Sequence, residues 1–260
     1  MCIEGLLWRV VDILSQKALA AVDRYSAFLD QLRTQLTAAV RADPSRGDVQ
    51  RSARASSVRL AQGFVQREND LISADTAEIA QIALSDVSSE LGVTQPVELN
   101  PDLTTHIELT GDILGRTLAA QVERDVGTFM REVAIAGLNV KVNTEAGLSQ
   151  AEAVLSVLAD KPKIASFRFI DRIGRKYNST KHVRDMYRQH LLNSYNEIYL
   201  HSLAGAGYDL ASIWHPDVNS EAYGQKLSIT SGGDFPSYYD VQDQFFHPTS
   251  QALVRANVES

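Results

Sequence analysis

The 260-residue chain contains a single cysteine and no long apolar run. Cys2 has no second cysteine to pair with, which excludes an intrachain disulfide and fits a reducing compartment. The apolar stretch at residues 5–8 is followed at once by Arg9, and no later stretch approaches the ~18 apolar residues that a membrane helix needs. The first residues also lack the charged start and cleavage site of a signal peptide. We therefore expect a soluble protein, made in the cytoplasm, that has no membrane partner.

The chain also lacks the sequence signatures of common enzymes. It has no Gly-x-Ser-x-Gly motif, and no histidine lies near the one cysteine in the sequence. Ser231-Gly232-Gly233 lacks the Lys-Ser/Thr that completes a phosphate-binding loop, so a turn after a strand explains it better. Asp240 and Asp243 lie on a tyrosine-rich segment, where solvent exposure is the simpler explanation for two carboxylates. We expect no enzymatic activity and no cofactor.

Basic residues are outnumbered by acidic ones, 25 to 32, and the net charge of −7 argues against a protein that coats nucleic acid with its whole surface. Between residues 161 and 188, however, only Asp171 and Asp185 oppose a run of basic residues. This basic segment consists of Lys161, Lys163, Arg168, Arg172, Arg175, Lys176, Lys181, Arg184 and Arg188. Such a cluster could bind DNA phosphates or an acidic protein partner. A solvated helix face would look the same, because no base-reading motif accompanies the charge.

Histidines collect late in the chain, where five of the six follow residue 180. His190 and His201 share a helix face, but eleven residues of helical rise separate them by ~16 Å, too far to ligate one zinc ion. His215, Asp217 and His247 leave open a metal-dependent hydrolase or nuclease built around these three residues. Each of these two histidines precedes a proline, which is more typical of a turn. We therefore expect no metal site.

The first 160 residues are expected to form a helical arm or bundle. Apolar residues at three- and four-residue steps predict one long helix over residues 1–41, ended by the turn that contains Pro44 and Gly47. Further helices are predicted at residues 49–72 and from Asp75 to Gly92, because Asp75 and Glu78 are spaced like a capping box.

Two more helices are predicted before residue 160. One covers residues 112–136, with Gly137 as its C-cap, and a short one begins at the capping box formed by Ser149 and Glu152. Residues 95–105 contain Pro96 and Pro101 and are expected to form a linker or a connecting loop.

The composition changes after residue 160, and residues 161–260 are expected to form a separate module. A helix that starts at Ser179 or Thr180 should end near Ala204, before Gly205 and Gly207. Residues 210–214 and 226–229 have the length and composition of strands, and the tail after residue 245 is a candidate third strand. The predicted fold class is mainly α, with a small α+β C-terminal module whose short strands are antiparallel.

The densest aromatic stretch of the chain lies in this module. It comprises Phe235, Tyr238, Tyr239, Phe245 and Phe246. Clustered aromatic residues on an irregular segment are typical of a protein interface, but they also fill the core of a small module. The sequence supports both interpretations equally.

The order of the parts in the last third of the chain is its most informative feature. These parts are a helix from Tyr187-Arg188 to Leu203, Gly207-Tyr208-Asp209, Trp214-His215-Pro216-Asp217, Gly224-Gln225-Lys226-Leu227-Ser228, Phe235-Pro236-Ser237-Tyr238 and Phe246-His247-Pro248. In this order they resemble the C-terminal module of phage minor head, or head-morphogenesis, proteins. The residues that define the module in this chain are Trp214, His215, Asp217, Lys226, Ser228, His247 and Pro248.

The chain departs from that family at two places. Residues 218–221 and 249–252 contain no cysteine, whereas many members carry a cysteine pair and an Asn-Cys-Arg-His run there. We therefore expect no cysteine- or metal-linked stabilisation of the module.

The resemblance implies a minor structural protein of a tailed-phage head that aids head assembly or DNA packaging. Its implied location is the virion head, and its implied partners are the portal or major capsid protein, further copies of itself and, through the basic segment, packaged DNA. A non-viral helical adaptor that docks through the aromatic residues is the remaining alternative.

Overall fold

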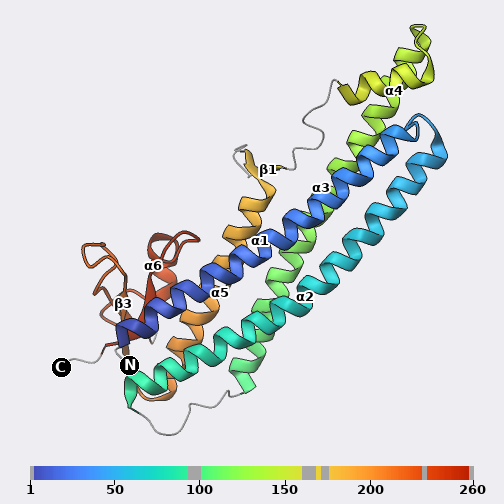
Figure 1. Ribbon diagram of the computed structural model, residues 1–260. Coiled ribbons are helices and arrows are strands. Elements are labelled where there is room, and N and C mark those ends of the chain that lie inside the picture. The colour runs from blue at the N-terminus through green and yellow to red at the C-terminus, as the bar shows by residue number, and fades with distance from the viewer. Residues whose placement is uncertain (1–2, 93–100, 160–167, 171–175, 230–232, 258–260) are drawn as a thin grey trace. The chain divides into compact units, whose positions relative to one another are not determined.

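The computed structural model describes residues 3–92, 101–159, 168–170, 176–229 and 233–257. The helices are α1 (Ile3–Arg41), α2 (Gly47–Leu91), α3 (Pro101–Glu145), α4 (Gln150–Ala159), α5 (Ser179–Gly205) and α6 (Tyr238–Phe245). The strands are β1 (Arg168–Ile170), β2 (Lys176–Asn178), β3 (Leu210–Trp214), β4 (Lys226–Ser228) and β5 (Leu253–Ala256). The protein is therefore mainly helical, with a small antiparallel sheet near its C-terminus (Figure 1), and the predicted fold class is confirmed.

The chain packs as two compact units. The first comprises residues 1–21, 69–114 and 184–260, and the second comprises residues 22–68 and 115–183. Helices α1, α2, α3 and α5 each contribute residues to both units. The expected boundary at residue 160 therefore does not separate them, because the long helices cross from one unit to the other.

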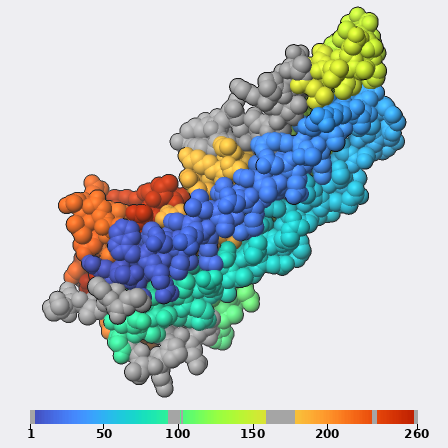
Figure 2. Space-filling model, viewed as in Figure 1, coloured from blue at the N-terminus to red at the C-terminus, as the bar shows by residue number. Residues whose placement is uncertain are grey.

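Helix α1 forms where the apolar spacing predicted it. Leu14, Ala18, Ala21 and Tyr25 follow one another at three- and four-residue steps and are all buried. The helix ends before Asp43, which adopts a left-handed φ of 71°. In the second unit, the end of α1 and the start of α2 are joined by this turn and lie side by side, as Figures 1 and 2 show.

Helix α2 is one continuous helix, and the prediction of a break before Asp75 was wrong. Asp75 does not cap a helix. Its two carboxylate oxygens accept hydrogen bonds from Lys17 Nζ at 2.6 Å and from the Tyr187 hydroxyl at 2.6 Å. Asp75 and Glu78 have the spacing of a capping box, but their side chains contact other helices instead. The helix continues through them, and no proline or glycine interrupts the chain between residues 64 and 91.

Helix α3 is also longer than predicted. It starts at Pro101, a residue that suits the first helical position because it lacks an N–H group, so residues 101–105 are helical and not a linker. Gly137 is not a C-cap, because the helix continues to Glu145. The predicted capping box of α4 is confirmed: the Glu152 side chain accepts from the Ser149 N–H at 2.9 Å, and the Glu152 N–H donates to Ser149 Oγ.

The C-terminal sheet has the strand order β4-β3-β5, with both neighbours antiparallel to β3. Leu210 pairs with Ser228, and Trp214 pairs with Leu253. Gly207 has a φ of 84°, which explains the glycine after α5. Helix α6 was expected to be part of an irregular aromatic segment, but a capping box of Ser237 and Asp240 starts it. Strands β1 and β2 form a separate antiparallel hairpin before α5.

Candidate functional site

Helix α5 organises the C-terminal module, and Arg188 is its central contact. The Arg188 side chain is 8% exposed, and its Nη1 group donates to the carbonyl oxygens of Pro248 at 2.7 Å and Ser250 at 2.5 Å. Burial lowers the pKa of Arg188. The guanidinium therefore holds the His247-Pro248 turn onto α5, and Arg188 does not belong to an exposed basic surface as predicted.

Three polar residues on the same side of α5 also bind the C-terminal segment. Gln189 donates to the carbonyl oxygen of Phe246 at 2.6 Å, and Asn196 accepts from the backbone N–H of Val254 at 2.9 Å. Asn193 accepts from the hydroxyl of Tyr238 at 3.1 Å. The sequence analysis missed these three residues. Their spacing of four and three residues on a helix with a buried aromatic face was the available signal.

The last strand is fixed by the C-terminal end of α2. The Glu90 carboxylate accepts from the Ala256 backbone N–H at 3.2 Å and from the Tyr199 hydroxyl, and it lies 3.4 Å from Arg255 Nη2. Asn196 and Glu90 therefore bind main-chain N–H groups along the outer edge of β5. An unoccupied strand edge could instead pair with a strand of another chain. One helical turn earlier, Asp86 accepts from the Tyr195 hydroxyl at 3.0 Å, and burial raises the pKa of the Asp86 carboxyl.

His215, Asp217 and His247, the residues of the alternative metal-dependent hydrolase or nuclease, make hydrogen bonds within local turns. His215 Nδ1 accepts from the backbone N–H of Asp217 at 3.1 Å, and the Asp217 carboxylate accepts from the N–H of Asn219 at 2.9 Å. His247 Nδ1 lies 3.0 Å from Thr249 Oγ1. Among the residues that the structure describes, no three His, Cys, Asp or Glu side chains could hold a metal ion. The structure therefore gives no support to a metal-dependent hydrolase built on His215, Asp217 and His247.

The other residues that define the module are structural. The Trp214 ring is buried and meets the Trp8 ring edge-on, with centroids 5.8 Å apart. Ser228 Oγ accepts from the backbone N–H of Phe235 at 3.1 Å. Lys226 Nζ lies 5.7 Å from the centre of the Phe235 ring. These contacts tie β3 to α1 and tie β4 to the segment before α6.

The aromatic residues divide between core and surface. Tyr238 and Phe246 are buried with ring centroids 4.8 Å apart, so the prediction of an interface role was wrong for these two. Phe245 is half-buried, whereas Phe235 is exposed and Tyr239 is 64% exposed. Of these five residues, Phe235 and Tyr239 therefore offer the most aromatic surface to a partner.

A cavity of about 370 Å³ lies beside Tyr239 and is lined by Glu197, His201 and Ile229 among others. The lining residue Glu197 also contacts His106, with Oε2 and Nε2 2.5 Å apart. This hydrogen bond outweighs burial and raises the pKa of His106. The His106 ring also lies near the ring of His201, with centroids 5.9 Å apart.

The basic segment is described only in part. Lys161, Lys163, Arg172 and Arg175 lie outside the described residues, as does Ser231-Gly232. Arg168 and Lys176 belong to the β1–β2 hairpin. Lys181 is exposed, and Arg184 Nη2 lies 2.9 Å from the carboxylate of Asp185.

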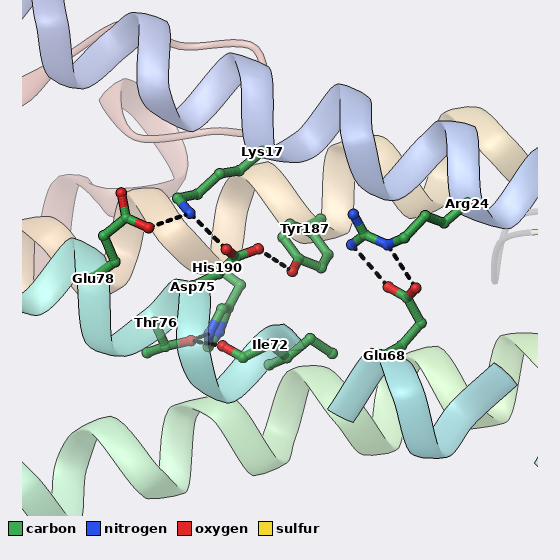
Figure 3. Close-up of polar contacts among 9 residues, drawn as sticks. All are labelled: Lys17, Arg24, Glu68, Ile72, Asp75, Thr76, Glu78, Tyr187 and His190. Atoms are coloured by element: carbon green, nitrogen blue, oxygen red, sulfur yellow. Dashed lines mark hydrogen bonds and ion pairs between the residues drawn. The ribbon is translucent and has the colours of Figure 1, made fainter. Parts of the chain in front are cut away.

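A cluster of charged and polar residues joins α1, α2 and α5 in the first unit (Figure 3). Lys17 Nζ lies 2.6 Å from Asp75 and 2.8 Å from Glu78, and Tyr187 donates to the same Asp75 carboxylate. Burial opposes the Lys17 charge, but the hydrogen bonds to both carboxylates outweigh it and raise the pKa of Lys17. The two carboxylates of α2 therefore pair with the charge of Lys17 on α1, and the Tyr187 hydroxyl ties α5 to the same cluster.

His190 lies next to this cluster. Its Nε2 atom is 3.1 Å from Thr76 Oγ1, which donates its only proton to the Ile72 carbonyl at 2.7 Å (Figure 3). The hydroxyl oxygen must then accept from Nε2–H, so His190 is protonated at Nε2. Burial lowers the pKa of His190 to about 4.

The second unit has polar contacts of its own. Arg24 makes two hydrogen bonds to Glu68, at 2.7 and 3.0 Å (Figure 3). Deeper in this unit, the buried Asp125 carboxylate accepts from the Tyr25 hydroxyl at 2.5 Å and from Ser179 Oγ at 3.1 Å. Burial raises the pKa of the Asp125 carboxyl. These contacts join α1, α2, α3 and the start of α5.

Comparisons with known proteins returned no match, whether against models of protein families, curated proteins or solved structures. Within the described residues, no helix has the length and apolar character that crossing a membrane requires. The resemblance to phage minor head proteins therefore rests on the order of the C-terminal parts alone.

Proposed function

We propose that this protein is a minor structural component of a tailed-phage head, associated with the portal or the inner capsid. The observation that carries the proposal is the order of the C-terminal parts. The helix, the two strands and the closing aromatic-His-Pro turn belong to one packed module, in which Arg188 on α5 binds the carbonyl of Pro248. A module of this kind suits a protein that must keep its shape within a particle.

The chemistry of the polar residues supports a structural role. The module's Arg188, Gln189 and Asn196 bind main-chain groups of the C-terminal segment, and Glu90 binds the last strand. His215 and His247 are engaged in turns. These side chains serve stability, whereas an active site would place them around an open space for substrate.

The partner contacts in this proposal come from two regions. Phe235 and Tyr239 present aromatic surface that a neighbouring subunit of the head could bury. The basic segment, which includes the exposed Lys181, would face packaged DNA or an acidic portal surface.

The deciding experiment is to purify particles from the source culture on a density gradient and to quantify this chain by mass spectrometry. The expected result is a fixed, low ratio of this chain to the main shell protein in DNA-filled particles. Detection in empty precursors alone would make it an assembly factor. Absence from particles, with the chain in the soluble cell fraction, would overturn the proposal and favour the adaptor alternative.

A pair of variants tests the basic segment. Replacing Lys161, Arg168, Arg172, Arg175 and Lys176 with glutamine should lower particle yield or genome content. The control replaces five exposed arginines of the second unit, Arg41, Arg51, Arg54, Arg59 and Arg67, and removes the same charge. Normal particles from the first variant, or equal defects from both, would count against a specific role for the basic segment.

A further inference from the structure

The last part of α3 carries an exposed apolar stripe in the second unit. Ile135, Leu138 and Val142 are 43%, 64% and 60% exposed. Arg131 and Glu145 are also exposed and extend the same line at its two ends. We call these five residues the α3 seam.

The spacing of the α3 seam is that of a helix made to pack against another helix. Its successive steps are four, three, four and three residues, from 131 to 135, 138, 142 and 145. This alternation places all five side chains on one face of α3 and matches the core positions of a coiled coil. The opposite face of the same helix is already used, since Val133, Ala136 and Val140 are buried in the second unit.

The charges at the two ends indicate what covers the seam. Arg131 lies seven residues before Leu138, and Glu145 lies seven residues after it. A two-fold axis through Leu138 would therefore bring Arg131 of each copy opposite Glu145 of the other. A parallel arrangement would place like charges together at both ends, which is unfavourable.

From this we infer that the α3 seam is a self-association surface, on which a second copy of this chain docks antiparallel about Leu138. The intrahelical contact between Lys141 and Glu145 does not compete strongly, because it is 3.9 Å long and both side chains are 68% exposed. The seam is short, with three apolar residues per copy, so the dimer should be weak and dependent on concentration. This inference does not depend on the proposed role in a phage head.

Analytical ultracentrifugation of the purified chain tests the inference between about 5 µM and about 500 µM, a range suited to a small interface. The expected result is a monomer–dimer equilibrium within this range. Leu138→Glu should weaken dimerisation by at least about tenfold. The matched control is Leu155→Glu, which changes an equally exposed leucine (64%) on α4 and should alter dimerisation by less than about twofold. A chain that stays monomeric throughout, or equal losses from both variants, would overturn the assignment.

Charge reversals test the antiparallel register. Arg131→Glu and Glu145→Arg should each weaken the dimer by about three- to tenfold, and the double variant should recover to within about twofold of the original chain. Additive weakening in the double variant would refute the pairing of these two residues.

Cross-linking provides a second, independent measurement of the geometry. In a Cys2→Ser background, Leu138→Cys should oxidise to a covalent dimer, because residue 138 of the two copies would meet at the axis. Arg131→Cys should not, since the two copies of residue 131 would lie ~21 Å apart along the helices. The reverse pattern would indicate a parallel dimer and overturn the inference.

Discussion

A methyl group at Gly137 would lie 2.5 Å from the carbonyl oxygen of Pro44 and 3.0 Å from its carbonyl carbon. The last part of α3 therefore touches the backbone of the turn between α1 and α2 directly, within the second unit. A backbone neighbour cannot move aside as the end of a flexible side chain can. Glycine at position 137 is required by this approach and not by the end of a helix.

Gly137→Ala is expected to lower the free energy of unfolding by about 1–3 kcal/mol, because the new methyl group overpacks the contact with Pro44. The control is Gly127→Ala in the same helix, where the nearest atom is the flexible end of Arg131 at 3.9 Å. That change should stabilise the protein by about 0.5–1 kcal/mol through helix propensity. Urea denaturation measures both values, and a stabilising Gly137→Ala would contradict the close approach.

Arg188→Met should destabilise the protein by about 2–3 kcal/mol, because it leaves the carbonyl oxygens of Pro248 and Ser250 without their donor. Hydrogen exchange should accelerate in residues 246–256, which Arg188 holds onto α5. Arg184→Met removes the same charge from a more exposed position and should change stability by less than about 0.5 kcal/mol. Similar effects from the two variants would show that charge, and not the buried contact, is responsible.

The pair formed by His106 and Glu197 should stabilise the protein more in mild acid than in mild base. Glu197 raises the pKa of His106 above its usual value of 6.5, so the folded state binds a proton more tightly than the unfolded state. This stabilisation is fully present below pH 6.5 and is lost as the pH rises through the raised pKa. His106→Gln should therefore cost more stability at pH 6 than at pH 9, and a cost that does not change with pH would contradict the pairing.

His190 should act in the opposite direction. Its pKa falls to about 4, so the folded state resists protonation, and stability is lost as the pH falls from about 6.5 towards about 4. The loss is on the order of 2–3 kcal/mol for this one group. His190→Gln keeps a donor for Thr76 but cannot titrate, so its unfolding free energy should fall less steeply over this range. Parallel pH profiles for the two proteins would show that His190 is not buried in the neutral form.

Local sequence patterns predicted much of the secondary structure. The apolar period of α1, the capping box of Ser149 and Glu152, the glycine at position 207 and the segments of β3 and β4 were all recognisable. Each of these depends on groups within a few residues of one another. The energy that selects such structure is mostly local, so a single stretch of sequence is enough to reveal it.

The errors arose where the same local pattern has two physical uses. Asp75 and Glu78 have capping spacing, but Lys17 and Tyr187 from other helices bind Asp75. Gly137 resembles a C-cap, but the close approach of Pro44 explains it. In both cases the deciding partner lies far away in the sequence, and nothing near the residue identifies it.

For the candidate site too, some features depend on local sequence and others on contacts between distant segments. The sequence by itself determined that the chain is mainly helical, which parts occur in the last third and in what order, and where the basic and aromatic residues collect. Only the tertiary structure decided which of those residues are available to a partner. It buries Arg188 under the Pro248 turn and Phe246 in the core, while Tyr239 and Leu138 stay exposed. The physical reason is that burial depends on segments that meet after folding, whereas helix and strand patterns depend on neighbours along the chain.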